Sequence, residues 1–149
     1  MDKLVELKKN SKWKLNNEWF DKNKKEKKNW IDKTLDDLNK ETEEAKKEGG
    51  KIHPLQLALD VQEVLTENDW LVIDGGNTHF WSEIAINISG SKGKKLGGIL
   101  HPGTFSMLGV GVPFAISAKN LNPKSNVVLI SGDGAFLSGG LSIEAAFQE

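Results

Sequence analysis

The residues best suited to chemistry lie in the segment LISGDGAFLSGG, where Asp133 stands between Gly132 and Gly134. A carboxylate in a glycine turn can ligate Mg²⁺, which takes one or two protein carboxylates together with phosphate oxygens. Free backbone amides at such a turn, including that of Ala135, can face an anion. The segment predicts a site for magnesium and a diphosphate, with an ordinary turn as the alternative. It lacks the spacing of a dinucleotide fingerprint and the Gly-Lys-Ser/Thr ending of a nucleotide P-loop.

A second candidate is the segment IDGGNTHFW, in which Gly76, Asn77 and Thr78 open an expected helix. Glycines allow close backbone approach, and a helix N-terminus with neutral donors suits phosphate oxygens. The alternative is a turn with a helix cap, since Asn and Thr are common capping residues.

The third candidate is GTFSMLGVGVPFAISA, with glycines at 103, 109 and 111. A glycine inside a helix costs about 1 kcal/mol relative to alanine, so these glycines indicate close packing or a ligand. The three histidines, His53, His79 and His101, have no metal-ligand spacing to one another, and we expect them to be separate turn or surface residues.

The order of apolar runs and glycine turns predicts the elements that position these segments. Residues 70–73 and 127–130 are short uncharged runs typical of buried strands, and residues 96–100 form a further short segment. Helices are expected from Pro54 to Glu67 and over 79–87, 107–121 and 141–147, the first burying a face made of Leu57, Val61, Val64 and Leu65. Alternating strands and helices predict an α/β fold with a doubly wound parallel sheet, whose ligands bind beyond the carboxyl ends of the strands.

The composition divides the 149 residues in two. Residues 1–51 carry 15 Lys and 12 acidic residues at helical spacings, which predicts an exposed charged helix ending at Gly49-Gly50, whereas residues 52–149 carry 5 Lys and 9 acidic residues. Trp13, Trp19 and Phe20 add apolar area to the first part, and we expect them to dock against a larger body.

The overall composition excludes several classes of protein. No cysteine is present, which excludes disulfide frameworks and thiolate metal sites, and a net charge of -1 argues against a nucleic-acid partner. No apolar run approaches the roughly 18 residues of a membrane span. We therefore expect a cytoplasmic protein with no membrane partner.

Taken together and in this order, the three segments resemble the diphosphate-binding domain of thiamine diphosphate-dependent enzymes. The resemblance covers about residues 52–149, and its nearest group contains acetolactate synthase, benzaldehyde lyase and 2-hydroxyacyl-CoA lyase. It implies thiamine diphosphate and Mg²⁺ as cofactors, with Asp133 as a metal ligand. It also implies diphosphate contacts from two groups of residues, Gly76-Asn77-Thr78 and Gly132 to Ala135.

In this family the third segment seats the aminopyrimidine ring, and a bulky apolar side chain bends the cofactor. An alignment on Gly109, Gly111 and Pro113 makes Leu108 that side chain and gives the carbonyl to Ser106. A shift by one residue gives the role to Met107, so both assignments stay open.

The sequence also departs from the family pattern. The Asn that closes the cofactor motif as second metal ligand does not occur before residue 149, and nothing matches the activating Glu, which the family carries on another domain. The resemblance thus implies a truncated or split cofactor domain, inactive alone. Its implied partner is a pyrimidine-binding domain or subunit, in an enzyme that is oligomeric when complete.

The type of reaction is left open between decarboxylase, lyase and carboligase, with acetolactate synthase favoured. Two alternatives remain at this point. The chain could be a nucleotide-binding α/β domain, or a remnant without function.

Overall fold

The computed structural model describes residues 16–47 and 49–148, so Trp13 lies outside the described residues. The chain divides into two compact units, Met1–Asp37 and Leu38–Glu149, and each is considered by itself. Since this division falls within one helix, the domain boundary expected at residue 51 stays a prediction.

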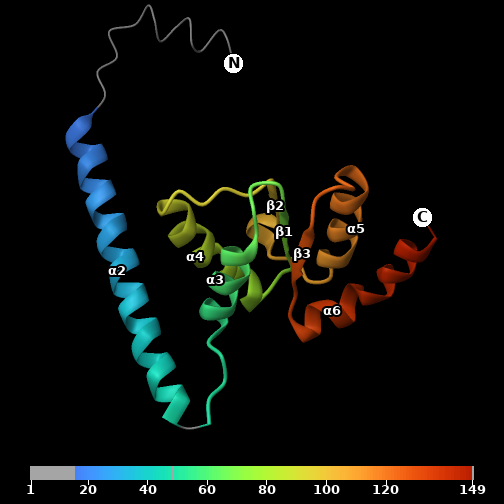
Figure 1. Cartoon of the computed structure of the whole chain (residues 1–149), viewed down its shortest axis with the longest axis horizontal. Coiled ribbons are helices and arrows are strands. Elements are labelled where there is room, and N and C mark those ends of the chain that lie inside the picture. Colours follow the sequence, from blue (N-terminus) through green and yellow to red (C-terminus); the bar gives the residue numbers. More distant parts are fainter. Residues whose placement is uncertain (1–15, 48, 149) are drawn as a thin grey trace, which may run out of the picture. The chain divides into compact units, whose positions relative to one another are not determined.

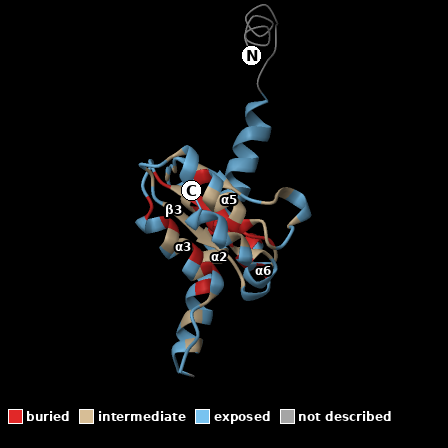
Figure 2. Cartoon of the chain, turned by 90° about the vertical axis from the view of Figure 1, so that its right-hand side faces the viewer, coloured by how far each residue is buried: buried red, intermediate tan, exposed pale blue. Residues whose placement is uncertain are grey.

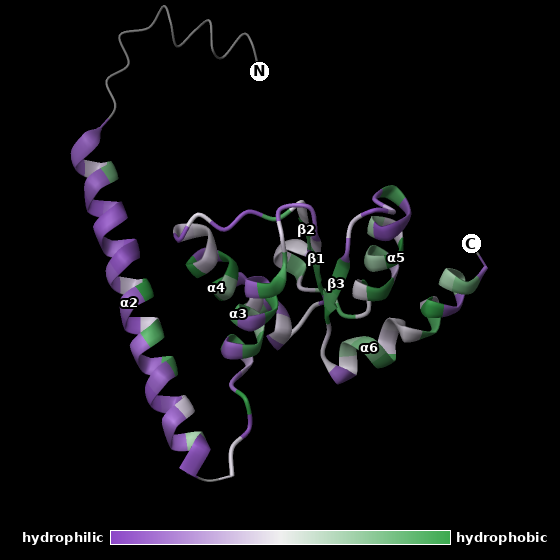
Figure 3. Cartoon of the chain, viewed as in Figure 1, coloured by the Kyte–Doolittle hydropathy of each residue, from purple (hydrophilic) through white to green (hydrophobic). Residues whose placement is uncertain are grey.

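The charged N-terminal part forms the helix α2 (Asn17–Lys47), which is hydrophilic over most of its length (Figure 3). Its first turn is capped by Asn16, whose Oδ1 accepts a hydrogen bond of 3.0 Å from the N–H of Trp19. At its other end, Gly49 has a φ of +80° and Gly50 donates to the carbonyl of Ala45 at 3.0 Å. The expected glycine stop is therefore confirmed.

The docking of Trp19 and Phe20 against a larger body stays a prediction, because both residues lie in the first unit. Trp19 and Phe20 are each 62% exposed. Charged residues follow them on the helix, including the exposed pair Lys22–Glu26, whose Nζ and Oε1 atoms are 3.8 Å apart.

The second unit is built on a three-stranded parallel sheet in the order β2-β1-β3 (Figure 1). The strands are β1 (Trp70–Ile73), β2 (Gly98–Leu100) and β3 (Val127–Ile130), with Trp70 paired to both Gly98 and Val127. The central strand is fully buried at Leu71, Val72 and Ile73. Continuous apolar runs suit strands covered on both faces, and the predicted α/β parallel fold is confirmed.

Helices cover both faces of this sheet. In Figure 1, α3 (Pro54–Val64) and α4 (Asn77–Ser91) lie on one side and α5 (Gly111–Leu121) on the other. The chain ends in α6 (Asp133–Gly139) and the 3₁₀ helix η2 (Gly140–Phe147), and a 3₁₀ turn, η1 (Gly103–Phe105), precedes α5. Buried residues gather around the strands (red in Figure 2).

The predicted buried face of the first of these helices is wrong in part. Leu57 is 50% and Val64 77% exposed, whereas the buried positions are Leu55, Ala58 and Gln62. Helix α3 packs against α4, and a small buried residue such as Ala58 is suited to a close approach of helices. Which face of a helix is buried depends on the elements around it, and periodicity within one segment does not reveal these.

Helix boundaries differ from the prediction for local reasons. The helix expected from residue 107 begins at Gly111, because Ser106 (φ +46°) and Gly109 (φ +86°) adopt left-handed backbone conformations that no α-helix contains. The helix expected over 79–87 is longer at both ends, and that expected over 141–147 is the 3₁₀ helix η2, preceded by α6.

None of the helices within the described ranges is long and apolar enough to cross a lipid bilayer. The cytoplasmic location stays a prediction from composition.

The amino end of the sheet is fixed by the buried carboxylate of Asp69. Its Oδ2 accepts hydrogen bonds from the N–H and hydroxyl of Thr66 at 2.8 and 2.7 Å, and its Oδ1 accepts from the N–H and side-chain amide of Asn126 at 3.1 and 2.9 Å. These contacts join the starts of β1 and β3. Hydrogen bonds from the Thr66 side chain, then from its backbone, and further ones from Asn126 lower the pKa of Asp69 from its ordinary 3.8 to about 2.

We expect Asp69→Asn to lower the free energy of unfolding at neutral pH. Three of the four groups that donate to Asp69 are N–H groups, and the amide nitrogen that replaces one carboxylate oxygen cannot accept a hydrogen bond from them. The native pKa lies below its ordinary value, so the stabilisation is present above pH 3.8 and is lost as the pH falls toward about 2. Urea denaturation at a series of pH values should show a flatter acid limb for the variant. Asp60→Asn, at an exposed position of α3, is the control, and an equal effect there would refute the assignment.

Candidate functional site

The order of the strands places a reversal of winding direction at the carboxyl ends of β1 and β3, a region that we refer to as the crevice. The chain leaves β1 to form β2 on one side and later forms β3 on the other side. In open α/β sheets, ligands bind where the direction of winding reverses in this way. Two of the predicted segments, 74–78 after β1 and 131–135 after β3, begin at this point.

The centre of the crevice floor is Asp74, a fully buried residue that sequence reasoning did not select. Its Oδ1 accepts hydrogen bonds from the N–H of Gly75 at 2.8 Å and of Gly109 at 2.9 Å, and its Oδ2 accepts from the hydroxyl of Ser131 at 3.0 Å. One carboxylate therefore joins the three predicted segments. Its position could have identified it from the sequence. Asp74 directly follows a fully buried strand, where a charged side chain needs hydrogen-bond partners.

The loop before α5 lies directly on the first segment. The N–H of Gly76 donates to Ser106 Oγ at 2.9 Å, and a Cβ at Gly75 would collide with the carbonyl oxygens of Ser106 and Met107. The side chain of Leu108 also faces this segment, with Cδ2 3.2 Å from a Cβ built on Gly76. The structure thus brings together Gly76 and the predicted residues Ser106, Met107 and Leu108.

This loop is held in an uncommon backbone conformation. Ser106 is the one non-glycine residue with positive φ (+46°) among those described, a conformation that costs about 1 kcal/mol. Its hydroxyl contacts both the N–H of Gly76 and, at 3.2 Å, Nδ1 of His79. These contacts offset the strain and fix the direction of the neighbouring carbonyl groups.

The segment after β3 meets the first segment through Thr78. A Cβ on Gly132 would lie 3.7 Å from Thr78 Cγ2, and Thr78 Oγ1 donates to the carbonyl of Gly75 at 3.1 Å. Ala135, at the other end of this segment, is buried.

Two polar side chains of the crevice remain exposed, those of Asn77 and Asp133. Across the described ranges, the carboxylate of Asp133 takes part in no hydrogen bond or ion pair, and no atom lies within 4 Å of a Cβ built on Gly134. An unpaired carboxylate beside open space fits a hard cation such as Mg²⁺, whose remaining ligands would be phosphate oxygens and water.

Two of the histidines are not the separate surface residues that we expected. His79 is buried, and its Nε2 lies 3.1 Å from Nδ1 of His101 and 3.2 Å from Glu83 Oε1. The pairing of β2 with β1 brings the two histidines together, although 21 residues separate them in the sequence. Spacing along the chain therefore gave no sign of this cluster.

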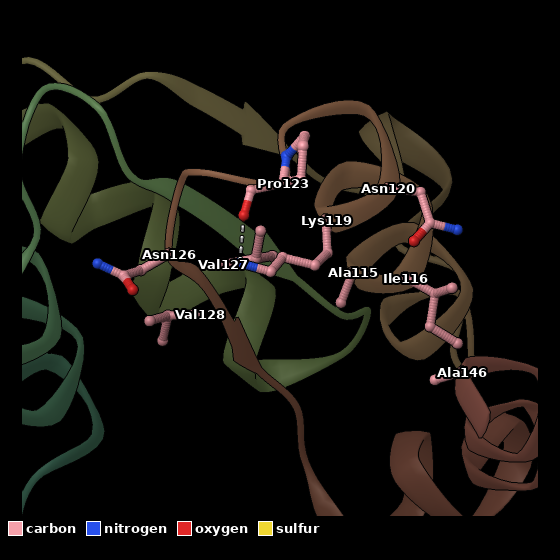
Figure 4. Close-up of a pocket in the computed structure, with 9 residues that line it drawn as sticks. All are labelled: Ala115, Ile116, Lys119, Asn120, Pro123, Asn126, Val127, Val128 and Ala146. Carbon is pink, nitrogen blue, oxygen red and sulfur yellow. Dashed lines mark hydrogen bonds between the residues drawn. The ribbon is translucent and has the colours of Figure 1, made fainter. Parts of the chain in front are cut away.

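A pocket of about 1080 Å³ lies elsewhere, near the start of β3 (Figure 4). It is lined mainly by aliphatic carbon, including Ala115, Ile116 and Val128, and its one charged side chain, Lys119, donates to the carbonyls of Pro123 at 3.0 Å and Ser125 at 2.8 Å. Since this pocket offers no carboxylate and lies at the amino end of β3, it is separate from the crevice.

Comparison with known families gives a match to the second half of the chain. The family model described as "Thiamine pyrophosphate enzyme, C-terminal TPP binding domain" matches residues 74–149, just over half of the chain. The match begins at Asp74 and contains all three segments that meet there. The chain belongs to this family. Thiamine pyrophosphate, also called thiamine diphosphate, is the cofactor of its members, which commonly use it together with Mg²⁺.

Curated relatives come from two kinds of thiamine diphosphate enzyme. The catabolic acetolactate synthase of Raoultella terrigena is 32% identical over 97 residues, covering 65% of this chain and 16% of the relative. A probable acetolactate synthase of Mycobacterium bovis is 30% identical over 112 residues, 72% of this chain and 19% of the relative. Human 2-hydroxyacyl-CoA lyase 2 is 38% identical over 85 residues, 57% of this chain and 13% of the relative. The chain thus spans less than a fifth of the length of these relatives.

We expect Asp74→Ala to lower the free energy of unfolding by about 3 kcal/mol, because it leaves two backbone N–H groups and a hydroxyl without their acceptor. Asp74→Asn should cost less, since its amide oxygen still accepts from both N–H groups while its NH₂ donates to Ser131. Urea denaturation gives both values. Equal losses for the two variants would contradict the role of Asp74 as a shared acceptor.

We expect Gly75→Ala to be destabilising by about 2 kcal/mol or more, since its Cβ would collide with backbone carbonyls that must move. Gly134→Ala is the matched control, because its Cβ meets open space, and the change should leave thermal stability unchanged or slightly higher. Similar melting temperatures for the two variants would show that the loop of Ser106 does not rest on Gly75.

Proposed function

We propose that residues 74–149 hold the diphosphate and Mg²⁺ of thiamine diphosphate in a 2-oxoacid decarboxylase or carboligase such as acetolactate synthase. The observation that carries this proposal is the convergence of three segments on Asp74, which leaves the carboxylate of Asp133 exposed at the crevice. Family membership supplies the identity of the cofactor.

Asp133 is the proposed metal ligand. Its carboxylate follows the Gly132 turn, and the open space beside Gly134 leaves room for phosphate oxygens. On the other side of the crevice, Asn77 and Thr78 begin the 15-residue helix α4, whose first N–H groups have no partner within the helix. Diphosphate contacts are proposed from two groups of residues, Gly76-Asn77-Thr78 and Gly132-Gly134-Ala135.

The loop from Ser106 to Leu108 is proposed to seat the aminopyrimidine ring. Leu108 and Met107 are both more than half exposed, so either side chain is accessible to a ligand. Of the two, Leu108 is favoured as the residue that bends the cofactor, because its Cδ2 lies over Gly76 at the diphosphate end. Ser106 contributes the carbonyl, whose direction its left-handed backbone sets.

When bound, thiamine diphosphate supplies a nucleophilic carbon that adds to the carbonyl of a 2-oxo acid. This chain's residues would hold its diphosphate and exclude water, and a pyrimidine-binding domain or subunit would provide the activating carboxylate. We therefore propose that the 149 residues are inactive alone and act in an oligomeric enzyme. Residues 1–51 are proposed as a charged segment leading in from a preceding domain, and residues 52–149 as the first part of the cofactor domain.

Isothermal titration with thiamine diphosphate and Mg²⁺ tests the assignment, with the chain alone and with a separate pyrimidine-binding domain. Asp133→Asn should weaken Mg²⁺-dependent binding by at least about tenfold, the scale on which changes around bound metals act. Glu144→Gln is the matched control, since it removes an exposed carboxylate of η2 and should leave binding unchanged.

ATP and NAD serve as competing ligands in the same titration. Tighter binding of either would favour a nucleotide-binding domain, and an unchanged affinity of Asp133→Asn would refute the metal assignment. Failure to bind any of the three ligands, with the partner domain present, would favour a remnant without function.

A further inference from the structure

The strongest feature outside the proposed cofactor contacts is the cluster of His79, Glu83 and His101. His79 and Glu83 stand four residues apart on α4, so their side chains share one face of the helix. His101 directly follows β2, and the pairing of Leu100 with Val72 carries it to the same edge of the sheet. The three ligand atoms all lie within 4.8 Å of one another.

The separations in this cluster match the coordination sphere of a metal ion. His79 Nε2 lies 3.1 Å from His101 Nδ1 and 3.2 Å from Glu83 Oε1, and the latter two atoms are 3.5 Å apart. Ligands about 2.0 Å from a tetrahedral Zn²⁺ are about 3.3 Å from one another. The ring centroids of the two histidines are 5.1 Å apart, so the two nitrogens lie on the facing edges of their rings.

Two of the three atoms in the cluster are hydrogen-bond acceptors that compete for one proton. The N–H of Gly103 donates to His101 Nδ1 at 3.3 Å, so this nitrogen carries its one lone pair, and a bound metal would replace this long hydrogen bond. Glu83 Oε1 is also an acceptor, so a single proton on His79 Nε2 would have to serve both. A cation at the centre would satisfy all three atoms.

The surroundings of His79 have the form that metal-binding histidines require. A histidine bound to metal through one nitrogen almost always donates its other N–H to an oxygen. Here Nδ1 of His79 lies 3.2 Å from Ser106 Oγ, which orients the ring. The side chain of His79 is 11% exposed, against 42% for Glu83 and 37% for His101, so the outer side of the cluster is open to water.

The geometry points to a second metal site in this chain, in which His79 Nε2, Glu83 Oε1 and His101 Nδ1 bind a divalent transition metal, Zn²⁺ in the first instance. Two imidazoles and one carboxylate with an open fourth position are a ligand set that zinc takes in proteins. Magnesium prefers oxygen ligands, so this site is distinct in chemistry from the one proposed at Asp133.

The test uses the 149-residue chain without a polyhistidine tag, stripped of metal with a chelator. Titration with Co²⁺ should give one equivalent of visible absorption typical of low coordination number, and Zn²⁺ should displace it. His101→Ala and Glu83→Gln, both at partly exposed positions, should each weaken binding by at least about tenfold. Circular dichroism of each variant checks that it is folded.

The chain offers a matched control in the pair of His53 and Glu41, where Nε2 lies 3.2 Å from Oε2 and the described residues supply no third ligand. Glu41→Gln and Asp133→Asn should therefore leave Co²⁺ binding unchanged. The proposal is overturned if the unaltered chain binds no stoichiometric Co²⁺, if folded His101→Ala binds as tightly as the original, or if either control abolishes the signal. Because Asp133→Asn separates the two sites, failure of the magnesium assignment would leave this result intact.

Discussion

The hydrogen bonds to Asp74 are the constraint on which the carboxyl edge of the sheet depends. A carboxylate with no exposed surface is stable only when its oxygens are fully hydrogen-bonded, and Asp74 finds its donors on Gly75, Gly109 and Ser131. These residues belong to three segments far apart in the sequence. Because displacement of any one segment leaves a buried charge under-solvated, the three must sit together. The crevice is therefore shaped before any ligand enters it, which is the preorganisation that tight binding of an anion requires.

The central strand is fixed by a carboxylate at each end. Four residues of strand bury Leu71, Val72 and Ile73 completely, yet apolar contacts are non-directional and would tolerate a shift in register. Asp69 at one end holds Asn126, and Asp74 at the other holds Ser131, so the β1–β3 pairing from Trp70 with Val127 to Ile73 with Ile130 is bracketed by directional bonds. These hydrogen bonds fix the register of the β1–β3 pairing, which three buried aliphatic side chains alone would not determine.

How far the sequence predicts this molecule depends on the range of the interaction involved. The strands at 70–73 and 127–130 were predictable because a short uncharged apolar run between turns is typical of a buried strand. Which face of α3 is buried was not predictable in this way. Leu57 and Val64 have the spacing of a buried face but are exposed, whereas Ala58 is buried. The contact between His79 and His101 was not predictable because it depends on the pairing of two strands. The role of Asp74 was not predictable because its hydrogen-bond partners lie up to 57 residues away. The three segments could therefore be recognised from the local sequence, whereas the role of Asp74 in joining them could not.

The loop from Gly103 to Gly109 connects the crevice to the histidine cluster through one hydroxyl group. Ser106 Oγ receives the N–H of Gly76 on one side and lies 3.2 Å from His79 Nδ1 on the other, while Gly109 at the end of the loop donates to Asp74. A hydroxyl has two acceptor lone pairs and one proton, so the protonation of His79 Nδ1 decides whether Ser106 accepts from it or donates to it. Any cation held by His79 Nε2 fixes the proton on Nδ1 and hence makes Ser106 an acceptor on both sides. The loop backbone at Ser106 and Met107, whose carbonyl groups face Gly75, would then be held by contacts from the crevice and from the histidine cluster. Occupation of either site would therefore bias the conformation of the loop at the other.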